Sequence, residues 1–235
     1  MRRFFCFNVI LLLTAMMAGP SLAGSLTVNF AAGVTNVTTA LTGYSTYGDM
    51  MSGMNVQAFF QGGTSQTAVW ATTGSGAGAA TGTGWSLSES GDTFGSTWAL
   101  NNSGDLAISR VLIDAGPGDT VFDTRYLGDI DGTPGSARGW DFTLVSGGDP
   151  FNIIATYRDQ VALTGQNPVG DLYRYLDIVF QDTLFSSNNT LGFIADTDNI
   201  LFAGDIKPVP LPGAIVLLGS GLLGLVGIGF RKRRN

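Results

Sequence analysis

The sequence contains no histidine, and its single cysteine, Cys6, lies close to the N-terminus. Without histidine, Ser-His-Asp and Cys-His catalysis in their usual forms are excluded, and zinc and haem sites lose their commonest ligand. A lone cysteine also excludes a disulfide within the chain. The fold must therefore be held together by packing and hydrogen bonds.

Basic residues are scarce between the two ends of the chain. Residues 24–207 contain six of them against all 18 acidic residues, a formal charge of −12. All the acids but Glu89 are Asp. We expect no nucleic acid partner, because no basic face is available to neutralise phosphates. A composition rich in Asp, Gly, Thr and Ser is typical of a β protein with many turns, displayed outside the cell.

Residues 24–207 also lack a convincing amphipathic helix. Short runs of alternating polar and apolar residues recur instead, separated by Gly, Asn and Asp. We expect an all-β fold, a single β-sandwich of jelly-roll-like or immunoglobulin-like type. The predicted strands are Ser25 to Phe30, Val34 to Leu41, Asn55 to Phe60, Thr67 to Ala71, Thr97 to Leu100, Leu106 to Ile113, Trp140 to Val145, Phe151 to Tyr157, Gln160 to Leu163, Tyr173 to Phe180, Leu191 to Ile194 and Ile200 to Phe202.

Two segments have a special pattern. In the strand from Leu106 to Ile113, alternation places Arg110 within an apolar stripe, so we expect this face to meet an acidic partner or a sheet edge. The segment Thr73 to Gly84 is glycine-rich and of low complexity, which predicts a mobile loop outside the core.

The N-terminus has the three parts of a signal peptide. Arg2 and Arg3 give the positive start, Val9 to Met17 the apolar centre, and Ser21-Leu22-Ala23 the small residues that signal peptidase recognises. We expect residues 1–23 to be removed before Gly24, which leaves an ectodomain of residues 24–207.

The C-terminal tail, residues 208–235, also has an ordered pattern. Val209-Pro210-Leu211-Pro212-Gly213 precedes an uncharged run from Ala214 to Phe230, and Arg231, Lys232, Arg233 and Arg234 follow. The run would form a helix of about 26 Å, enough for a short membrane span. The basic cluster is expected on the cytoplasmic side of the inner membrane, with the ectodomain on the other side. Two interpretations remain open: a plain anchor, or a sorting signal that is cut.

This tail resembles the C-terminal sorting tails of PEP-CTERM proteins, in the variant whose signature is Val-Pro-Leu-Pro-Ala. Val209 to Pro212 match that signature, and Gly213 stands where Ala is usual. The resemblance covers about an eighth of the chain. It implies a Gram-negative bacterium, recognition and cleavage by an exosortase, and delivery to the cell surface or the extracellular polymer matrix.

The densest acidic stretch suggests calcium. Asp129-x-Asp131-Gly132 has the local form of a Ca²⁺ loop, and Asp119 and Asp123 lie shortly before it, so these four aspartates are the candidate ligands. The loop lacks the later ligands of an EF-hand. The alternative is that these aspartates only cap turns through hydrogen bonds to the backbone.

Three short segments, Phe122-Asp123, Gly132 to Ala137 and Ala195 to Asp198, resemble a pattern that recurs in ectodomains with such tails. This resemblance implies no known activity.

We expect a non-enzymatic structural protein of the cell surface or matrix that supports a biofilm. The alternative is a carbohydrate-binding module, with or without Ca²⁺, that uses Trp70, Trp85, Trp98, Trp140 and the tyrosines of Tyr173-Arg174-Tyr175 to stack on extracellular polysaccharide. A glycosidase would need a carboxylate pair, for which Asp141 and Asp177 are candidates, although no spacing singles them out.

Overall fold

A computed structural model describes residues 24–43, 45–125, 132–136, 138–148 and 151–202. The predicted signal peptide and the whole C-terminal tail lie outside these ranges. In the part that is described, the only helices are two 3-10 turns, η1 (Gly48–Met51) and η2 (Gly116–Gly118), and neither could cross a membrane.

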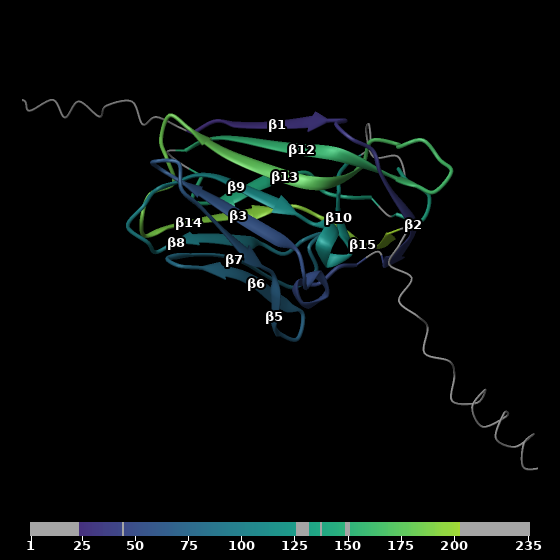
Figure 1. The fold of residues 1–235 in the computed structure, drawn as a ribbon, viewed down its shortest axis with the longest axis horizontal. Coiled ribbons are helices and arrows are strands. Elements are labelled where there is room, and N and C mark those ends of the chain that lie inside the picture. The colour runs from purple at the N-terminus through teal and green to yellow at the C-terminus, as the bar shows by residue number, and fades with distance from the viewer. Residues whose placement is uncertain (1–23, 44, 126–131, 137, 149–150, 203–235) are drawn as a thin grey trace, which may run out of the picture.

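More than half of the described residues lie in strands (Figure 1). The strands are β1 (Leu26–Ala31), β2 (Asn36–Gly43), β3 (Asn55–Phe60), β4 (Ser65–Val69), β5 (Ala71–Gly74), β6 (Ala77–Gly82), β7 (Trp85–Ser90), β8 (Trp98–Asn102), β9 (Ile108–Asp114), β10 (Thr120–Asp123), β11 (Thr143–Ser146), β12 (Asn152–Leu163), β13 (Leu172–Gln181), β14 (Asn189–Ile194) and β15 (Thr197–Phe202). The all-β prediction is confirmed.

The strands form two sheets, which is consistent with a β-sandwich. The larger sheet has the order β1-β12-β2-β15-β10-β13-β9-β3-β4, and the smaller one β11-β14-β8-β7-β6-β5. The main core is rich in aromatic side chains: Trp98 stacks on Phe193, and Phe142 on the other side of Phe193 has its ring centroid 4.7 Å away. Burial of such large rings supplies most of the driving force for a domain without disulfides.

Five strands of the larger sheet pair in a closed ring at one end of the domain. β12 pairs with β13, β13 with β10, β10 with β15, β15 with β2, and β2 again with β12. A second, smaller core of Val121, Val161, Leu172 and Ile200 belongs to these strands. β10, β15 and β2 are seen together at this end in Figure 1. The buried aspartates Asp123, Asp171 and Asp198 lie beside this ring of strands.

The prediction of a mobile loop from Thr73 to Gly84 is wrong. Most of this segment forms the β5–β6 hairpin, and Ala80 is buried. A side chain at Gly78 would collide with the indole of Trp70, and one at Gly82 with the indole of Trp85. The glycines therefore let the backbone lie against large rings, so a segment with few side chains still helps to close the core.

Other strand predictions differ in extent. β7 and β10 were not expected, although the sequence WSLSES of β7 alternates strictly. The two strands expected between Phe151 and Leu163 are one strand, β12, in which Asp159 has a positive φ of 60°. In β9 the register shifts beside β3, so Ile108 turns into the core while Arg110 faces outward. The expectation that Arg110 meets an acidic partner is confirmed below.

Candidate functional site

Four buried aspartates gather where β10, β15 and the start of β13 meet. Asp123 ends β10, Asp196 and Asp198 lie at the start of β15, and Asp171 precedes β13. All four are at most 4% exposed. Residues 132–136 pack against them through hydrogen bonds. The three segments that the sequence singled out as a pattern thus come together in one cluster, which we call the carboxylate cluster.

Asp171 holds the loop of residues 132–136 in place. Its carboxylate accepts the backbone N–H of Thr133, the Thr133 hydroxyl at 2.7 Å and the backbone N–H of Leu172 at 3.0 Å. A side chain at Gly132 would collide with this carboxylate. A fully hydrogen-bonded carboxylate of this kind stabilises the loop that it binds.

Ser136 links two of the other aspartates. Its Oγ lies 2.9 Å from Asp123 Oδ2 and 2.7 Å from Asp198 Oδ2. A hydroxyl has one proton, so it can donate to one of these carboxyls at a time. The second contact is favourable only if that carboxyl itself carries a proton, or if another positive group compensates its charge. The geometry therefore favours a neutral carboxylic acid in this pair.

The electrostatics of the carboxylate cluster point in the same direction. Burial, with the charges of Asp198 and Asp196, raises the pKa of Asp123 to about 9. Burial likewise raises the pKa of Asp196 to about 8 and that of Asp198 to about 6. Asp123 Oδ1 is buried without a hydrogen-bond partner, which is tolerable for a neutral acid and costly for a carboxylate.

The candidate calcium ligands do not come together among the described residues. Asp119 and Asp123 lie at opposite ends of β10, about 13 Å apart along the strand. Asp119 caps η2 with a left-handed backbone, in agreement with the turn interpretation. Asp129 and Asp131 lie outside the described residues. Within the described ranges, no group of three acidic side chains is arranged to hold a metal ion.

A second buried carboxylate is Glu89 in β7. Its Oε1 accepts the hydroxyl of Ser96, whereas its Oε2 is buried and has no partner. Burial raises the pKa of Glu89 to about 7. A pocket of about 450 Å³ lies nearby, with Tyr47, Asp49 and Gly76 among its lining residues, but Glu89 does not line it. Glu89 is thus not presented to a ligand in that pocket.

The candidate glycosidase pair does not form a site. Asp177 in β13 projects from the outer side of the larger sheet and binds Arg110. The carboxylate of Asp141 instead accepts the backbone N–H of Arg125 at 2.9 Å and lies near the buried Tyr157. The two groups are on opposite sides of the sheet, so they cannot flank one glycosidic bond.

The tryptophans do not offer a platform for sugars. Trp70, Trp85 and Trp98 are at most 2% exposed, and the indole N–H of each donates to an internal acceptor. Trp140 is half-buried, and the guanidinium of Arg125 covers it at 3.8 Å from the ring centroid. The four tryptophans therefore belong to the core or its rim.

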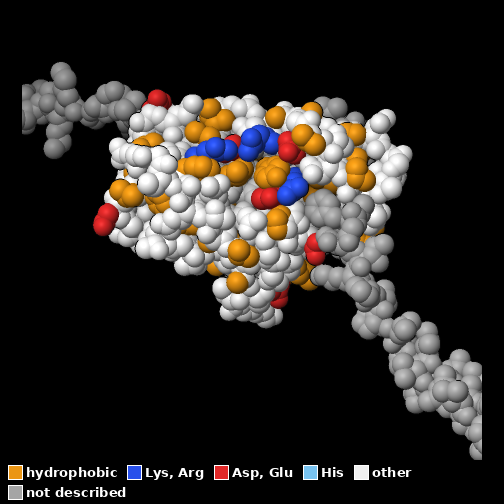
Figure 2. All heavy atoms as spheres, in the orientation of Figure 1, with side chains coloured by type: hydrophobic (Ala, Val, Ile, Leu, Met, Phe, Trp, Pro, Cys, Tyr) orange, Lys and Arg blue, Asp and Glu red, His pale blue; other side chains and the backbone are white. Residues whose placement is uncertain are grey.

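The outer side of the larger sheet carries a regular array of side chains across β3, β9, β13 and β12. Their sequence neighbours are buried, whereas most members of the array are half-exposed. The pairing gives three rows: Asn55, Asp114, Tyr175 and Arg158; Gln57, Leu112, Asp177 and Thr156; and Phe59, Arg110, Val179 and Ile154. We call this surface the open face. Figure 2 shows basic side chains gathered on it, with acidic ones beside them.

Charged and aromatic groups alternate along the open face. The Arg110 guanidinium lies over Phe59, 4.8 Å from the ring centroid, and binds Asp177 through two contacts of 2.6 and 2.9 Å. Arg158 approaches the same carboxylate at 3.5 Å and lies 5.8 Å from the ring centroid of Tyr175. Asp177 is therefore the acidic partner that the sequence pattern of Arg110 required.

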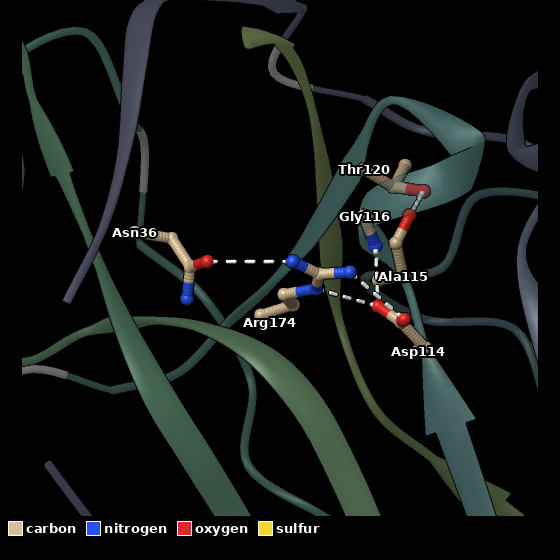
Figure 3. Close-up of polar contacts among 6 residues, drawn as sticks. All are labelled: Asn36, Asp114, Ala115, Gly116, Thr120 and Arg174. Atoms are coloured by element: carbon tan, nitrogen blue, oxygen red, sulfur yellow. Dashed lines mark hydrogen bonds and ion pairs between the residues drawn. The ribbon is translucent and has the colours of Figure 1, made fainter. Parts of the chain in front are cut away.

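Arg174 extends this arrangement toward the strand ring. Figure 3 shows its guanidinium between Asp114 and Asn36, with contacts of 2.8 and 3.0 Å to the carboxylate and 3.4 Å to the Asn36 side-chain oxygen. The guanidinium also lies 5.0 Å from the ring centroid of Tyr175. Arg174 thus ties β13 to β9 through an ion pair and to β2 through a hydrogen bond.

The sequence pattern found only part of these surfaces. It singled out Arg110 and the segment Tyr173-Arg174-Tyr175, but Tyr173 is buried and only Tyr175 reaches the open face. No sequence pattern singled out Arg158, because its place opposite Tyr175 depends on the register of β12 with β13. Asp171 was also missed, because its partner Thr133 lies 38 residues away.

Comparisons with protein-family models, with curated protein sequences and with solved structures each found no match for this chain.

Proposed function

We propose that this chain is an exported, non-enzymatic structural protein of a Gram-negative bacterium. It enters the export route through residues 1–23, is held briefly in the inner membrane by residues 214–230, and is cut near Val209 to Gly213 by an exosortase. The product is a β-sandwich domain, of jelly-roll-like or immunoglobulin-like type, at the cell surface or in the extracellular matrix, where it supports a biofilm.

The observation that carries this proposal is the short length of chain between the last described strand and the processing motif. β15 pairs with both β2 and β10, so the last described strand is built into the larger sheet up to Phe202. Val209 follows seven residues later, a length of chain that spans at most about 25 Å. The processing motif therefore begins within about 25 Å of the last described strand, which suits a substrate cut next to the membrane.

A role without catalysis fits the way the acidic side chains are used. Asp171 holds a loop, Asp177 pairs with arginine, and Glu89 is enclosed. Asp171 and Asp177 thus have structural tasks within the domain, as expected if its acids serve the fold rather than a reaction.

Intact mass of the protein from its native host, measured separately for membrane, periplasm and medium, tests the proposal. A product that begins at Gly24, ends between Val209 and Gly213, and lies outside the inner membrane is the expected result. A full-length C-terminus confined to the inner membrane would instead establish a plain anchor. Deletion of the host exosortase should convert the first pattern into the second.

The second candidate function is carbohydrate binding. Buried tryptophans give it no support, and replacing Trp85 by Ala would test the core rather than a binding surface. The observation that favours it is Tyr175, a half-exposed ring with the guanidiniums of Arg158 and Arg174 near it. Calcium dependence remains a prediction about Asp129 and Asp131, to be tested by titrating Ca²⁺ into protein freed of metal with a chelator.

A further inference from the structure

Strand β1 lies at one end of the larger sheet, and only β12 pairs with it among the described residues. Figure 1 shows it along the upper edge of the domain. Ile153 in β12 donates its backbone N–H to the carbonyl of Ser25. Alternation along a parallel pair then directs the backbone N–H and C=O groups of Leu26, Val28 and Phe30 away from β12. These groups are therefore available to a further strand.

The same three residues form the apolar side of β1. Leu26 is 38% exposed and Phe30 48% exposed, although Phe30 stacks on the buried ring of Tyr157. Val28 packs against the main core. Alternation places all three side chains on the inner face of the larger sheet, at the point where the core reaches the edge of the sandwich. A strand added beside β1 would therefore extend the core as well as the sheet.

β1 lacks the features that usually prevent an edge strand from pairing with another chain. Such strands are blocked by charged residues, proline, a bulge or short length. Residues 24–48 contain no charged residue and no proline, and β1 pairs with β12 in a continuous register over six residues. This edge of the larger sheet is therefore free to take another strand.

The other edges of the described sheets are less suitable. β5 and β11, at the edges of the smaller sheet, have four residues each and an irregular register. At the opposite edge of the larger sheet, the side chain of Gln66 in β4 accepts the backbone N–H of Thr83, so this edge is joined to the smaller sheet. Among the described strands, β1 is thus the longest regular edge.

A second copy of β1 is complementary to this edge. If the two strands run antiparallel about Val28, Leu26 of each copy lies opposite Phe30 of the other, and the two Val28 residues face each other. All three pairs then bring outward-directed backbone groups together, so each pair can exchange two hydrogen bonds. The opposed side chains are all apolar and lie on the same face. The strand thus provides a matching partner for itself.

The charge distribution also favours contact between copies at this place. Two domains with a formal charge of −12 repel each other, so they approach most easily through an uncharged segment. The acidic side chains bound to this segment lie at its two ends. Asp159 accepts the backbone N–H of Val34, and Asp182 contacts Asn152, which binds Ser25. The centre of β1 is therefore left for apolar and backbone contacts.

We infer that two copies of the chain pair through β1, antiparallel and centred on Val28, so that their larger sheets form one continuous sheet. The interface is symmetric and joins the copies in pairs. This inference rests on the proposed function for its biological meaning, because a structural protein of a surface or matrix needs contacts between its copies.

Disulfide formation tests the register of this pairing. In the full chain with Cys6→Ser, in a non-ionic detergent, Val28→Cys should place two Cα atoms about 5.5 Å apart, within the range that a disulfide spans. Asn29→Cys is the matched control, because its two copies would lie about 8 Å apart and should crosslink at least about fivefold less. A mixture of Leu26→Cys and Phe30→Cys chains should crosslink, whereas either chain alone should not. Non-reducing electrophoresis measures each product.

Charges placed on the edge test the strength of the contact. The double variant Leu26→Lys and Phe30→Lys should weaken dimerisation about tenfold or more, measured by sedimentation of the full chain in detergent. Val69→Lys is the matched control, because Val69 is a 60% exposed apolar residue in the other edge strand, β4. This variant should dimerise like the unaltered chain. Circular dichroism of each variant separates lost pairing from lost folding.

Three outcomes would overturn the inference. A chain that stays monomeric up to about 100 µM would leave the edge to a strand of another protein. Equal crosslinking at Val28 and Asn29 would exclude the register. A dimer that the two lysines do not weaken would place the contact elsewhere, for example in the tail. None of these assays depends on cleavage of the tail, so failure here and failure of the proposed function are distinguishable.

Discussion

The open face and the carboxylate cluster use the same side chain in opposite ways. On the open face, Asp177 pairs with Arg110, and beside it Asp114 pairs with Arg174. In the carboxylate cluster, Asp123 and Asp198 share the hydroxyl of Ser136, and no ion pair to them is found among the described residues. Aspartates on the open face are thus paired with arginine, whereas the structure favours neutral acids among Asp123, Asp196 and Asp198 of the cluster.

The difference shows how location decides the state of a carboxyl group. Near water, an arginine compensates the charge of a carboxylate with little net gain or loss in the free energy of folding. In the interior, an uncompensated carboxylate is so unfavourable that the group retains its proton well above its ordinary pKa. The ion pairs of the open face are therefore sensitive to salt, while the carboxylate cluster responds to pH. The following predictions test this contrast.

The largest effect is expected at Asp171. Asp171→Ala removes three hydrogen bonds and leaves the buried N–H groups of Thr133 and Leu172 without acceptors. We expect the free energy of unfolding to fall by about 3 kcal/mol. Urea denaturation of the full chain in detergent measures this value. Asp105→Ala, at an exposed position, is the control and should change stability little.

A pH titration of stability should show the state of the carboxylate cluster. Asp123, Asp196 and Asp198 have folded-state pKa values of about 9, 8 and 6, all above the unfolded value of 3.8. The folded state therefore holds more protons than the unfolded state between these limits, and stability present at pH 4 is lost as pH rises toward 9. We expect a fall of about 2 kcal/mol between pH 5 and pH 9, measured by urea denaturation with a chelator present.

Asp123→Asn is the matched variant for this titration, because it replaces the group with the highest pKa by a neutral one of the same shape. The pH dependence should become flatter. A stability that instead rises from pH 5 to pH 9 would mean that the carboxyls are ionised and compensated by a positive group.

The sequence predicted the class of fold because alternation is a local property. Asn55 to Phe60, for example, alternates half-buried and buried residues as expected. The glycine-rich hairpin was missed because its role depends on Trp70 and Trp85, whose large rings need a partner without side chains. Local composition does not reveal which ring a glycine will meet.

The candidate sites were harder to predict than the strands. Asp123 and Asp198 are 75 residues apart, and only the pairing of β10 with β15 brings them together. Arg158 joins the open face through the register of a long hairpin. Such convergence depends on strand order, which no short pattern specifies.

Glu89 gives a smaller and more local test of the buried acids. Its folded-state pKa of about 7 exceeds the ordinary value of 4.5, so the folded state favours its protonated form and its ionisation reduces stability as pH rises through this range. Glu89→Gln should raise the free energy of unfolding by about 1 kcal/mol at pH 8 and leave it nearly unchanged at pH 4. The difference between the two pH values, measured by chemical denaturation, cancels any effect of packing that is common to both. An equal change at both pH values would assign the effect to packing rather than to the proton.

The smallest effect is expected for the ion pair of the open face. A double-mutant cycle with Arg110→Gln and Asp177→Asn should give a coupling energy of about 1 kcal/mol, since the arginine side chain is 33% exposed while that of Asp177 is only 12% exposed. The coupling should weaken at high salt, because the pair is in contact with water. A coupling of several kcal/mol that does not change with salt would show that Asp177 is held as firmly as a buried ion pair. The contrast with the carboxylate cluster would then be lost, because both regions would hold their carboxyl groups away from water.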